Sequence, residues 1–290
     1  MFATPIGVAL LGAAEVAPAD PPSAAAVFAL AVVQGLTEFL PVSSSGHLAI
    51  GRSLLDVREG GLALDVALHV GTLLAIVWAF RRDVVKLFDD LLHGRLATWL
   101  WLAVATVPVG LVGVLAKDTI ETASGTVAAA GAGLFVTSAA LLMGERSRRK
   151  FEASHPAEPP RPGGPLTLRF GDAVAMGLAQ AVAIWPGVSR SGSTISAGLA
   201  RGLPAAEAAR LSFLMSLPAI SGAAIVELPD ALSEGFGGLS PWLVAAAAAV
   251  AGLVGWAALV TLLLVLRRGS FPYFAAYTAA LGAIALALGS

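Results

Sequence analysis

Long apolar stretches occupy most of the chain and predict helices that cross a membrane. A helix needs about 20 apolar residues to span the hydrocarbon layer. Six stretches reach that length, at residues 62–80, 97–116, 123–143, 207–228, 241–266 and 271–289. Two further apolar regions, 24–58 and 171–203, are broken near their midpoints by Pro, Gly and Ser. They predict re-entrant hairpins, because irregular backbone at membrane depth is tolerated only where it is buried in protein or lines a wet cavity.

The two broken regions are similar to each other. When residues 34–48 and 180–194 are aligned at a constant offset, five positions agree, whereas unrelated segments would share about one. The matching pairs are Gln34/Gln180, Val42/Val188, Ser43/Ser189, Ser45/Ser191 and Gly46/Gly192. Each copy carries several polar side chains into an apolar region, where such groups are costly and usually functional.

The order of the elements predicts an inverted repeat. Each hairpin is followed by three spans, so the odd number of crossings inserts the second copy upside down. The two hairpin tips are then expected to approach from opposite faces, as in transporters that bind ligands between broken helices. The predicted fold is all-α: a polytopic membrane protein with about six transmembrane helices plus two broken re-entrant helical hairpins in an inverted-topology repeat.

Lys and Arg sort to one side of this topology. Fourteen of the 18 fall in loops that the positive-inside rule assigns to the cytoplasm, while Arg52, Arg58 and Lys117 lie opposite and Arg190 lies within the membrane. A segment rich in proline and charge joins the two halves. The predicted organisation is a peripheral extension (1–23) and a single membrane domain (24–289), with repeat one at about 24–143, a cytoplasmic linker at 144–169 and repeat two at about 170–289.

Composition narrows the classes of protein further. The chain is 57% hydrophobic and 13% charged, with a mean hydropathy of +0.82, whereas soluble proteins carry about 25% charged residues. The absence of cysteine excludes disulfides and thiolate chemistry. A net charge of −1 gives no reason to expect a nucleic-acid partner. Ala- and Gly-rich runs at 128–133 and 245–255 suit close helix packing within the bilayer, and the same surfaces suit a homodimer.

Arg190 is the most informative residue of the second tip. Placing an arginine inside the membrane costs at least about 3 kcal/mol, and its planar fork of donors suits phosphate oxygens. Gly187 allows the backbone to approach a ligand, and a helix that begins here offers its N-terminus to an anion. The segment therefore predicts a phosphate site. The alternative is a structural arginine that pairs with Glu38 or caps backbone carbonyls.

The first tip holds the parts of an acid–base or nucleophilic site. Glu38, Ser44 and His47 bring a carboxylate, a hydroxyl and an imidazole within ten residues. Ser44 could attack phosphorus if His47 or Glu38 took its proton and Arg190 held the transferred charge. Attack by water, with Glu38 or His47 as base, is the other route. The spacing equally allows a structural role, in which Ser43 caps the next helix while His47 and Glu38 satisfy buried backbone.

Asp65 and His69 are polar residues within the first predicted span. They lie four residues apart, so that both side chains share one face of the helix. Contact with the site or with a metal is one interpretation of this pair. The favoured interpretation is a structural hydrogen bond inside the helix bundle.

Two motifs give the chain a specific resemblance. The segments Gln34–Leu48 and Pro186–Ile195 resemble the two signature motifs of the undecaprenyl pyrophosphate phosphatase family, the bacitracin-resistance type. Further similarity runs through Asp65–Leu74 and Glu207–Leu214, so that the resemblance covers nearly everything from about residue 24 to 289. The resemblance implies hydrolysis of undecaprenyl diphosphate to the monophosphate and inorganic phosphate, which recycles the lipid carrier of peptidoglycan synthesis.

The resemblance also implies a set of functional residues. By motif position, the family's functional residues correspond to Glu38, Ser44, His47, Ser189, Arg190 and Thr194. Their neighbours Ser43, Ser45, Gly187 and Ser191 complete the predicted substrate-binding set. Gln34 stands where many members have a second glutamate, so Gln34 and its counterpart Gln180 are given supporting parts. The family further implies a location in the cytoplasmic membrane, a site open to the extracytoplasmic side, and a divalent cation, Mg²⁺ or Ca²⁺, with Glu38 as a candidate ligand.

These observations lead to one preferred function and one alternative. In the preferred function Arg190 holds the diphosphate, Ser44 is the nucleophile, His47 is the general base and later acid, and Glu38 orients His47 or holds the cation. The side chains of Ser44 and Arg190 are then expected within about 10 Å of each other. The alternative is a transporter or flippase for a phosphorylated lipid without hydrolysis, because crossed re-entrant segments are transporter architecture.

Overall fold

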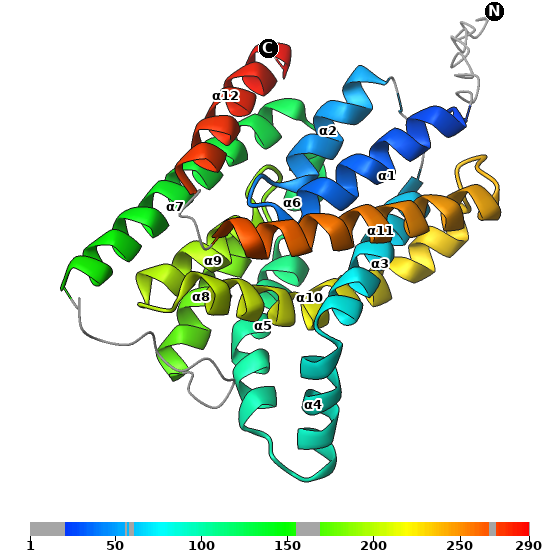
Figure 1. Ribbon diagram of the computed structural model, residues 1–290. Coiled ribbons are helices and arrows are strands. Elements are labelled where there is room, and N and C mark those ends of the chain that lie inside the picture. Colours follow the sequence, from blue (N-terminus) through cyan, green and yellow to red (C-terminus); the bar gives the residue numbers. More distant parts are fainter. Residues whose placement is uncertain (1–20, 56, 58–60, 155–168, 267–270, 290) are drawn as a thin grey trace, which may run out of the picture.

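The computed structural model describes residues 21–55, 57, 61–154, 169–266 and 271–289, and within them the chain is helical, without a strand (Figure 1). The helices of this part are α1 (Ala24–Phe39), α2 (Ser44–Leu54), α3 (Gly61–Ala79), α4 (Arg81–Leu92), α5 (Ala97–Leu115), α6 (Lys117–Ser124), α7 (Val127–Ser154), α8 (Phe170–Val182), α9 (Arg190–Ala200), α10 (Ala205–Glu234), α11 (Pro241–Val265) and α12 (Phe271–Gly289). The predicted extension 1–23 falls almost entirely outside the described residues.

Six of these helices are long and apolar enough to cross a membrane: α3, α5, α7, α10, α11 and α12. The prediction of an all-α polytopic membrane protein with six spans is therefore confirmed. Each of the two broken apolar regions forms a pair of shorter helices, α1 with α2 and α8 with α9. The short helices α4 and α6, which the hydrophobic pattern does not separate from the loops, connect successive spans.

The predicted linker 144–169 begins within a helix, because α7 continues to Ser154. Ion pairs at helical spacing stabilise the extra turns, because Arg148 binds Glu145 at 2.8 Å and Glu152 at 2.7 Å. The remaining linker residues 155–168 lie outside the described part of the chain.

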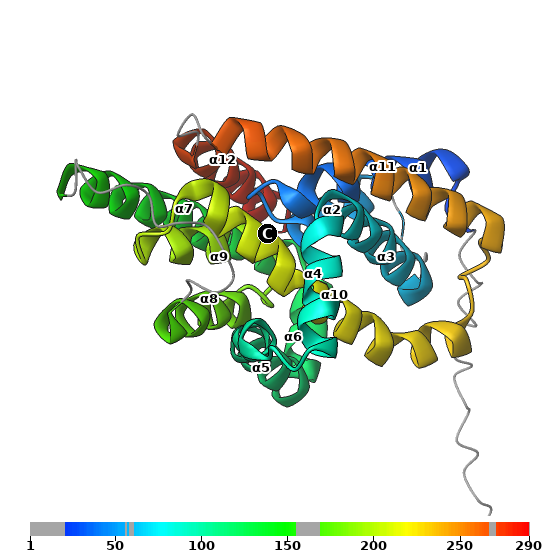
Figure 2. The same ribbon diagram turned by 60° about the horizontal axis from the view of Figure 1, so that its bottom comes forward.

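Helices of the two halves pack on each other rather than forming separate bundles (Figure 2). The first arm of each hairpin lies on a span of the opposite half: α1 packs on α11, and α8 packs on α5. In the same way, the contact between α3 and α11 has a counterpart in the contact between α10 and α5. Because α7 lies along α12 and α3 lies against α10, exchanging the two halves leaves this set of contacts unchanged.

Small residues allow these helices to approach closely. A Cβ atom on Gly71 of α3 would come within 2.1 Å of the Ala248 carbonyl oxygen on α11, and one on Gly131 of α7 would come within 3.1 Å of the Gly282 carbonyl oxygen on α12. The Ala- and Gly-rich runs therefore have partners within the chain. Their packing explains their composition without a second copy of the protein.

The end of α1 is fixed by an aromatic cluster. Phe39 is fully buried and packs edge-on against Phe213 of α10, with 5.6 Å between ring centroids. Phe213 in turn stacks on Phe80 at 6.1 Å. Such pairs stabilise by about 0.5–1.5 kcal/mol beyond their buried area. Since Glu38 directly precedes Phe39, this cluster also fixes the backbone from which the Glu38 carboxylate extends.

Candidate active site

The second arms of both hairpins begin in the same way. Ser43 caps α2 by accepting a hydrogen bond from the Gly46 backbone N–H at 3.3 Å, and Ser189 caps α9 by accepting one from Gly192 at 3.0 Å. Such caps stabilise a helix start by about 1 kcal/mol each. The first residues after the caps, Ser44 and Arg190, therefore occupy equivalent positions in the two tips. Both line one cavity, so the two helix N-termini face a common site.

Two serines connect the tips by hydrogen bonds to the backbone. The Ser45 hydroxyl accepts a hydrogen bond from the Gly187 backbone N–H at 3.2 Å, and the equivalent Ser191 hydroxyl donates to the Leu40 carbonyl oxygen at 3.1 Å. The partners differ because the residue equivalent to Gly187 is Pro41, which has no N–H to donate. The predicted meeting of the two tips is thus observed, and these two hydroxyls bind backbone of the opposite tip.

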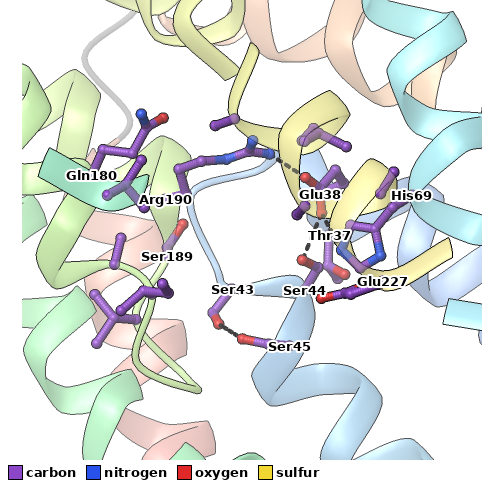
Figure 3. Close-up of a pocket in the computed structure, with 18 of the residues that line it drawn as sticks. Thr37, Glu38, Ser43, Ser44, Ser45, His69, Gln180, Ser189, Arg190 and Glu227 are labelled. Atoms are coloured by element: carbon purple, nitrogen blue, oxygen red, sulfur yellow. Dashed lines mark hydrogen bonds and ion pairs between the residues drawn. The ribbon is translucent and has the colours of Figure 1, made fainter. Parts of the chain in front are cut away.

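A cavity of about 260 Å³ lies between the tips and three spans, α3, α5 and α10 (Figure 3). Its polar side is formed mainly by the two hairpins, and its apolar wall by the spans and by the segment between α8 and α9. The polar lining residues are Thr37, Glu38, Ser43, Ser44, Ser45, His69, Gln180, Ser189, Arg190 and Glu227. The apolar lining residues are Val66, Val109, Ala183, Ile184, Val188, Ala219, Ile220, Ala223 and Ala224.

Glu38 is the centre of the polar side. Its side chain is 4% exposed and forms an ion pair with Arg190 through Oε1. The other oxygen, Oε2, accepts a hydrogen bond from the Ser44 hydroxyl at 2.7 Å and one from the Gln34 amide at 3.1 Å. Because Ser44 and Arg190 bind two oxygens of one carboxylate, they lie within the separation expected for a shared phosphate. Removing either charge of such a buried pair would leave the other uncompensated.

His47 does not take the position predicted for a base of Ser44. Its ring does not line the cavity. Nδ1 lies 2.7 Å from the Ser43 carbonyl oxygen and Nε2 lies 2.7 Å from the Tyr277 hydroxyl of α12. Both ring nitrogens therefore have other partners, while the Ser44 hydroxyl donates to Glu38. Of the two bases considered for Ser44, the one hydrogen-bonded to its hydroxyl here is the Glu38 carboxylate. The role of His47 as a base stays a prediction.

Three other predicted substrate-binding residues lie away from the cavity. The Thr194 hydroxyl is buried and bonds to the Arg190 carbonyl oxygen at 2.7 Å and to the Ser212 hydroxyl at 2.6 Å. Gly187 has φ +82°, and a Cβ there would lie 1.9 Å from the Ala130 carbonyl oxygen. This glycine allows close packing against α7. The Ser191 hydroxyl donates to the Leu40 carbonyl oxygen of the first tip, as described above.

The backbone of the first tip is strained at Ser43. Its φ of +71° is the only positive value among non-glycine residues in the described part of the chain. Such a conformation costs about 1–3 kcal/mol and persists where surrounding contacts enforce it, often at functional sites. The equivalent Ser189 has an ordinary φ of −71°. The strain is therefore specific to the tip that carries Ser44.

His69 and Glu227 also line the cavity: contact with the site was the less favoured interpretation of His69, and Glu227 was not predicted. The Nδ1 of His69 lies 2.9 Å from the Asp65 carbonyl oxygen, so Nδ1 carries a proton, and Nε2 lies 4.0 Å from Glu38 Oε2. The interpretation of His69 as purely structural was therefore incomplete. Asp65 instead pairs with Arg52. Glu227 lies on α10 and could have been found as an acidic residue at the end of an apolar span.

Two buried side chains support the second tip, Thr137 from outside the cavity and Gln180 from its lining. Thr137 of α7 accepts a hydrogen bond from the Ser189 N–H at 2.7 Å and donates to the Gly187 carbonyl oxygen at 2.9 Å. Gln180 donates to the Ala105 carbonyl oxygen at 3.2 Å, and its own carbonyl oxygen has no hydrogen-bond partner. Gln34 also keeps one unpartnered oxygen. The supporting parts given to Gln34 and Gln180 remain predictions.

Fold and site together define a polytopic membrane protein with a cavity between two helical hairpins, lined by Arg190 and by the starts of two helices. The family described as bacitracin resistance protein BacA matches residues 27–284. The undecaprenyl-diphosphatase of Rubrobacter xylanophilus is 42% identical over 272 residues, which cover 89% of this chain and 96% of the relative. That of Gemmatimonas aurantiaca is 39% identical over 269 residues, covering 89% and 95%, and that of Mycolicibacterium smegmatis is 37% identical over 275 residues, covering 90% and 95%. The chain belongs to the bacitracin resistance protein BacA family, as its two motifs predicted.

Proposed function

We propose that this protein is an integral membrane phosphatase that hydrolyses undecaprenyl diphosphate to undecaprenyl monophosphate and inorganic phosphate. The observation that carries the proposal is the convergence of Ser44 and Arg190 on the two oxygens of the buried Glu38 carboxylate. The relatives named above carry this activity in their names and cover about nine-tenths of the chain. The reaction regenerates the monophosphate carrier used in peptidoglycan synthesis.

Substrate binding begins with an exchange of partners at Arg190. The diphosphate replaces Glu38 on the guanidinium, whose planar fork matches two phosphate oxygens. Backbone N–H groups at the starts of α2 and α9 add further donors. The first isoprene units lie along the apolar wall formed by α5, α10 and the residues that follow α8, and the rest of the chain extends into the lipid.

The chemistry follows from the hydrogen bond between Ser44 and Glu38. Ser44 Oγ attacks the terminal phosphorus while its proton passes to Glu38 Oε2, which lies 2.7 Å away. The bond to the bridging oxygen breaks, undecaprenyl monophosphate leaves with the proton from Glu38, and Arg190 holds the charge on the transferred group. Water then attacks the phosphoserine, giving a proton to Glu38. Glu38 returns this proton to Ser44 as inorganic phosphate leaves.

A divalent cation, Mg²⁺ or Ca²⁺, is part of the proposal. Within the described part of the chain, no three His, Asp or Glu side chains are close enough together to hold a metal ion. Magnesium in phosphoryl-transfer sites is usually held by one or two carboxylates together with substrate phosphates, which suits a site with Glu38 alone. Glu38, released from Arg190 by the substrate, is the residue that would hold the ion. The cation would neutralise phosphate charge.

The position of the cavity along the spans supports a site open to the extracytoplasmic side. Basic residues of the predicted cytoplasmic side lie between α3 and α5, at Arg81, Arg82, Lys86 and Arg95, and before α10, at Arg201. The cavity residues of these spans fall in the opposite halves: Val66 and His69 early in α3, Val109 late in α5, and residues 219–227 late in α10. With the positive-inside rule, this arrangement points to the outer half of the cytoplasmic membrane.

The proposal is tested by incubating purified protein with undecaprenyl diphosphate in detergent and measuring inorganic phosphate, with and without Mg²⁺. We expect release of one phosphate per lipid, slowed about 10²–10⁴-fold in Glu38→Gln. Binding of the lipid diphosphate without release would refute hydrolysis. That outcome would leave a carrier of phosphorylated lipids as the function.

A further inference from the structure

The first tip is held in place by the last helix of the chain. The Tyr277 hydroxyl of α12 lies 2.7 Å from His47 Nε2, and the two rings stack with 5.6 Å between centroids and an interplanar angle of 16°. On its other side, His47 Nδ1 lies 2.7 Å from the Ser43 carbonyl oxygen. A carbonyl oxygen only accepts, so Nδ1 carries a proton and donates it. A continuous set of contacts thus joins α12 to the residue that precedes Ser44.

The residue held by this contact is the strained one. Ser43 has φ +71° and ψ +103°, outside the well-populated regions for a side chain with Cβ. The regular helical bond to its carbonyl, from the His47 backbone N–H, is long at 3.3 Å. The His47 ring supplies the shorter of the two donors to this carbonyl. Since the next residue is Ser44, the orientation of the Ser43 peptide sets the direction of the Ser44 hydroxyl.

The second tip is held in an equivalent manner, which argues that support by a span is a general feature of this fold. Thr137 of α7 binds both the Ser189 N–H and the Gly187 carbonyl oxygen. Helices α7 and α12 hold corresponding places in the two halves and lie side by side (Figure 1). Each hairpin is thus tied to one of them by side chains that do not line the cavity.

We propose that Tyr277 and His47 form a positioning pair for the reaction, in which Tyr277 anchors the imidazole and His47 holds the Ser43 carbonyl. His47 then exchanges no proton with Ser44 or the substrate. This inference rests on the proposed phosphatase function and adds Tyr277 to the residues on which turnover depends. It assigns His47 a hydrogen-bond donor's role, so that a non-titrating donor at the same place should replace it.

Two substitutions of His47 separate a donor from a base. In His47→Asn, the amide nitrogen occupies the place of Nδ1 and donates to Ser43, but it cannot titrate. In His47→Gln, the amide lies one bond further from the backbone and reaches toward Tyr277 instead. Turnover of undecaprenyl diphosphate is measured for both, with thermal unfolding in detergent as the control for folding. We expect kcat of the Gln variant to fall about 100-fold, that of the Asn variant to stay within about tenfold of the wild type, and KM to change little in either.

Tyr277→Phe provides a second, milder test, because the ring stack remains and only the hydroxyl is lost. We expect kcat to fall about fivefold with KM unchanged, and no further loss when Tyr277→Phe is combined with His47→Asn, whose amide does not reach the tyrosine. A folded Asn variant as inactive as the Gln variant would overturn the proposal, since it would show that a titratable ring is needed. Full kcat in Tyr277→Phe would also overturn it. Wild-type protein that releases no phosphate would instead remove the phosphatase function and this inference together.

Discussion

Glu38→Gln tests the central contact of the site, because it removes the charge and keeps the shape of the side chain. Glutamine can still accept a hydrogen bond from Ser44, but it cannot take its proton. Loss of a general base typically lowers turnover by about 10²–10⁴-fold, or about 3–5.5 kcal/mol of transition-state stabilisation. We therefore expect kcat to fall into this range while the protein remains folded.

The same substitution should have the opposite effect on substrate binding. In the free protein the Glu38 carboxylate occupies Arg190, so the diphosphate must displace it. Without that competitor, the uncompensated guanidinium is available for phosphate, and KM should stay equal or decrease. The free protein should lose stability, since breaking a buried pair costs about 3–5 kcal/mol. The Arg190 side chain is 19% exposed to the cavity, so water can partly solvate the guanidinium. We therefore expect a loss of folding free energy at the lower end of this range.

Steady-state phosphate release gives kcat and KM, and thermal unfolding with and without undecaprenyl diphosphate gives the stability and its recovery by ligand. The expected pattern is low kcat, unraised KM and a larger stabilisation by ligand than in the wild type. A Mg²⁺ titration adds a third measurement. Loss of a metal ligand should lower the affinity for Mg²⁺, so that the concentration needed for half-maximal activity rises at least about tenfold. Wild-type kcat in Glu38→Gln would refute the base, and a strongly raised KM would refute the competition for Arg190.

Three further outcomes follow from the same contacts. Arg190→Lys should lose about 100-fold in kcat/KM although the charge is kept, because an ammonium cannot grip two phosphate oxygens in one plane; near-normal kinetics would show that charge alone suffices. Ser44→Ala should abolish turnover while lipid binding persists, and the wild type should yield a trapped phosphoserine at Ser44; substantial turnover by the variant would establish attack by water. Ser45→Ala and Ser191→Ala should each lower kcat by a few-fold. The double variant should lower kcat by more than the product of the two single effects, because either bond alone keeps the tips together; a loss equal to that product would show that the bonds act independently.

The spans could be predicted from sequence because the bilayer imposes length and apolarity on every crossing segment. The predicted stretches 97–116 and 271–289 agree closely with α5 and α12. The broken hairpins were equally visible, since Pro41 and Pro186-Gly187 interrupt runs that would otherwise continue as helix. The helical start of the linker was not visible in the hydrophobic pattern, because Glu145 is charged and lies outside the predicted span. It is a good helix former and pairs with Arg148 and Arg149.

The placement of individual side chains could not be predicted in the same way. His47 and Glu38 both come from the first hairpin, and the sequence does not show which side of the tip each faces. The partner that draws His47 away from the cavity is Tyr277, 230 residues further along the chain. Thr194 follows a local rule instead: a buried helical threonine satisfies its hydroxyl on the carbonyl four residues earlier. A motif identifies the residues of a site, and tertiary packing decides which atoms reach it.

The repeat explains why two dissimilar groups meet so closely. Ser44 and Arg190 occupy equivalent positions, each the first residue of a helix whose cap is a serine. Inversion turns these two helix starts toward each other, so a substrate phosphate between them meets backbone donors from both tips. With identical residues at the two positions, the site would have either two nucleophiles and no cation or two cations and no nucleophile. In the proposed reaction, the difference between Ser44 and Arg190, with Glu38 between them, gives the symmetric scaffold a direction, because one tip supplies the nucleophile and the other the cation for the phosphate oxygens.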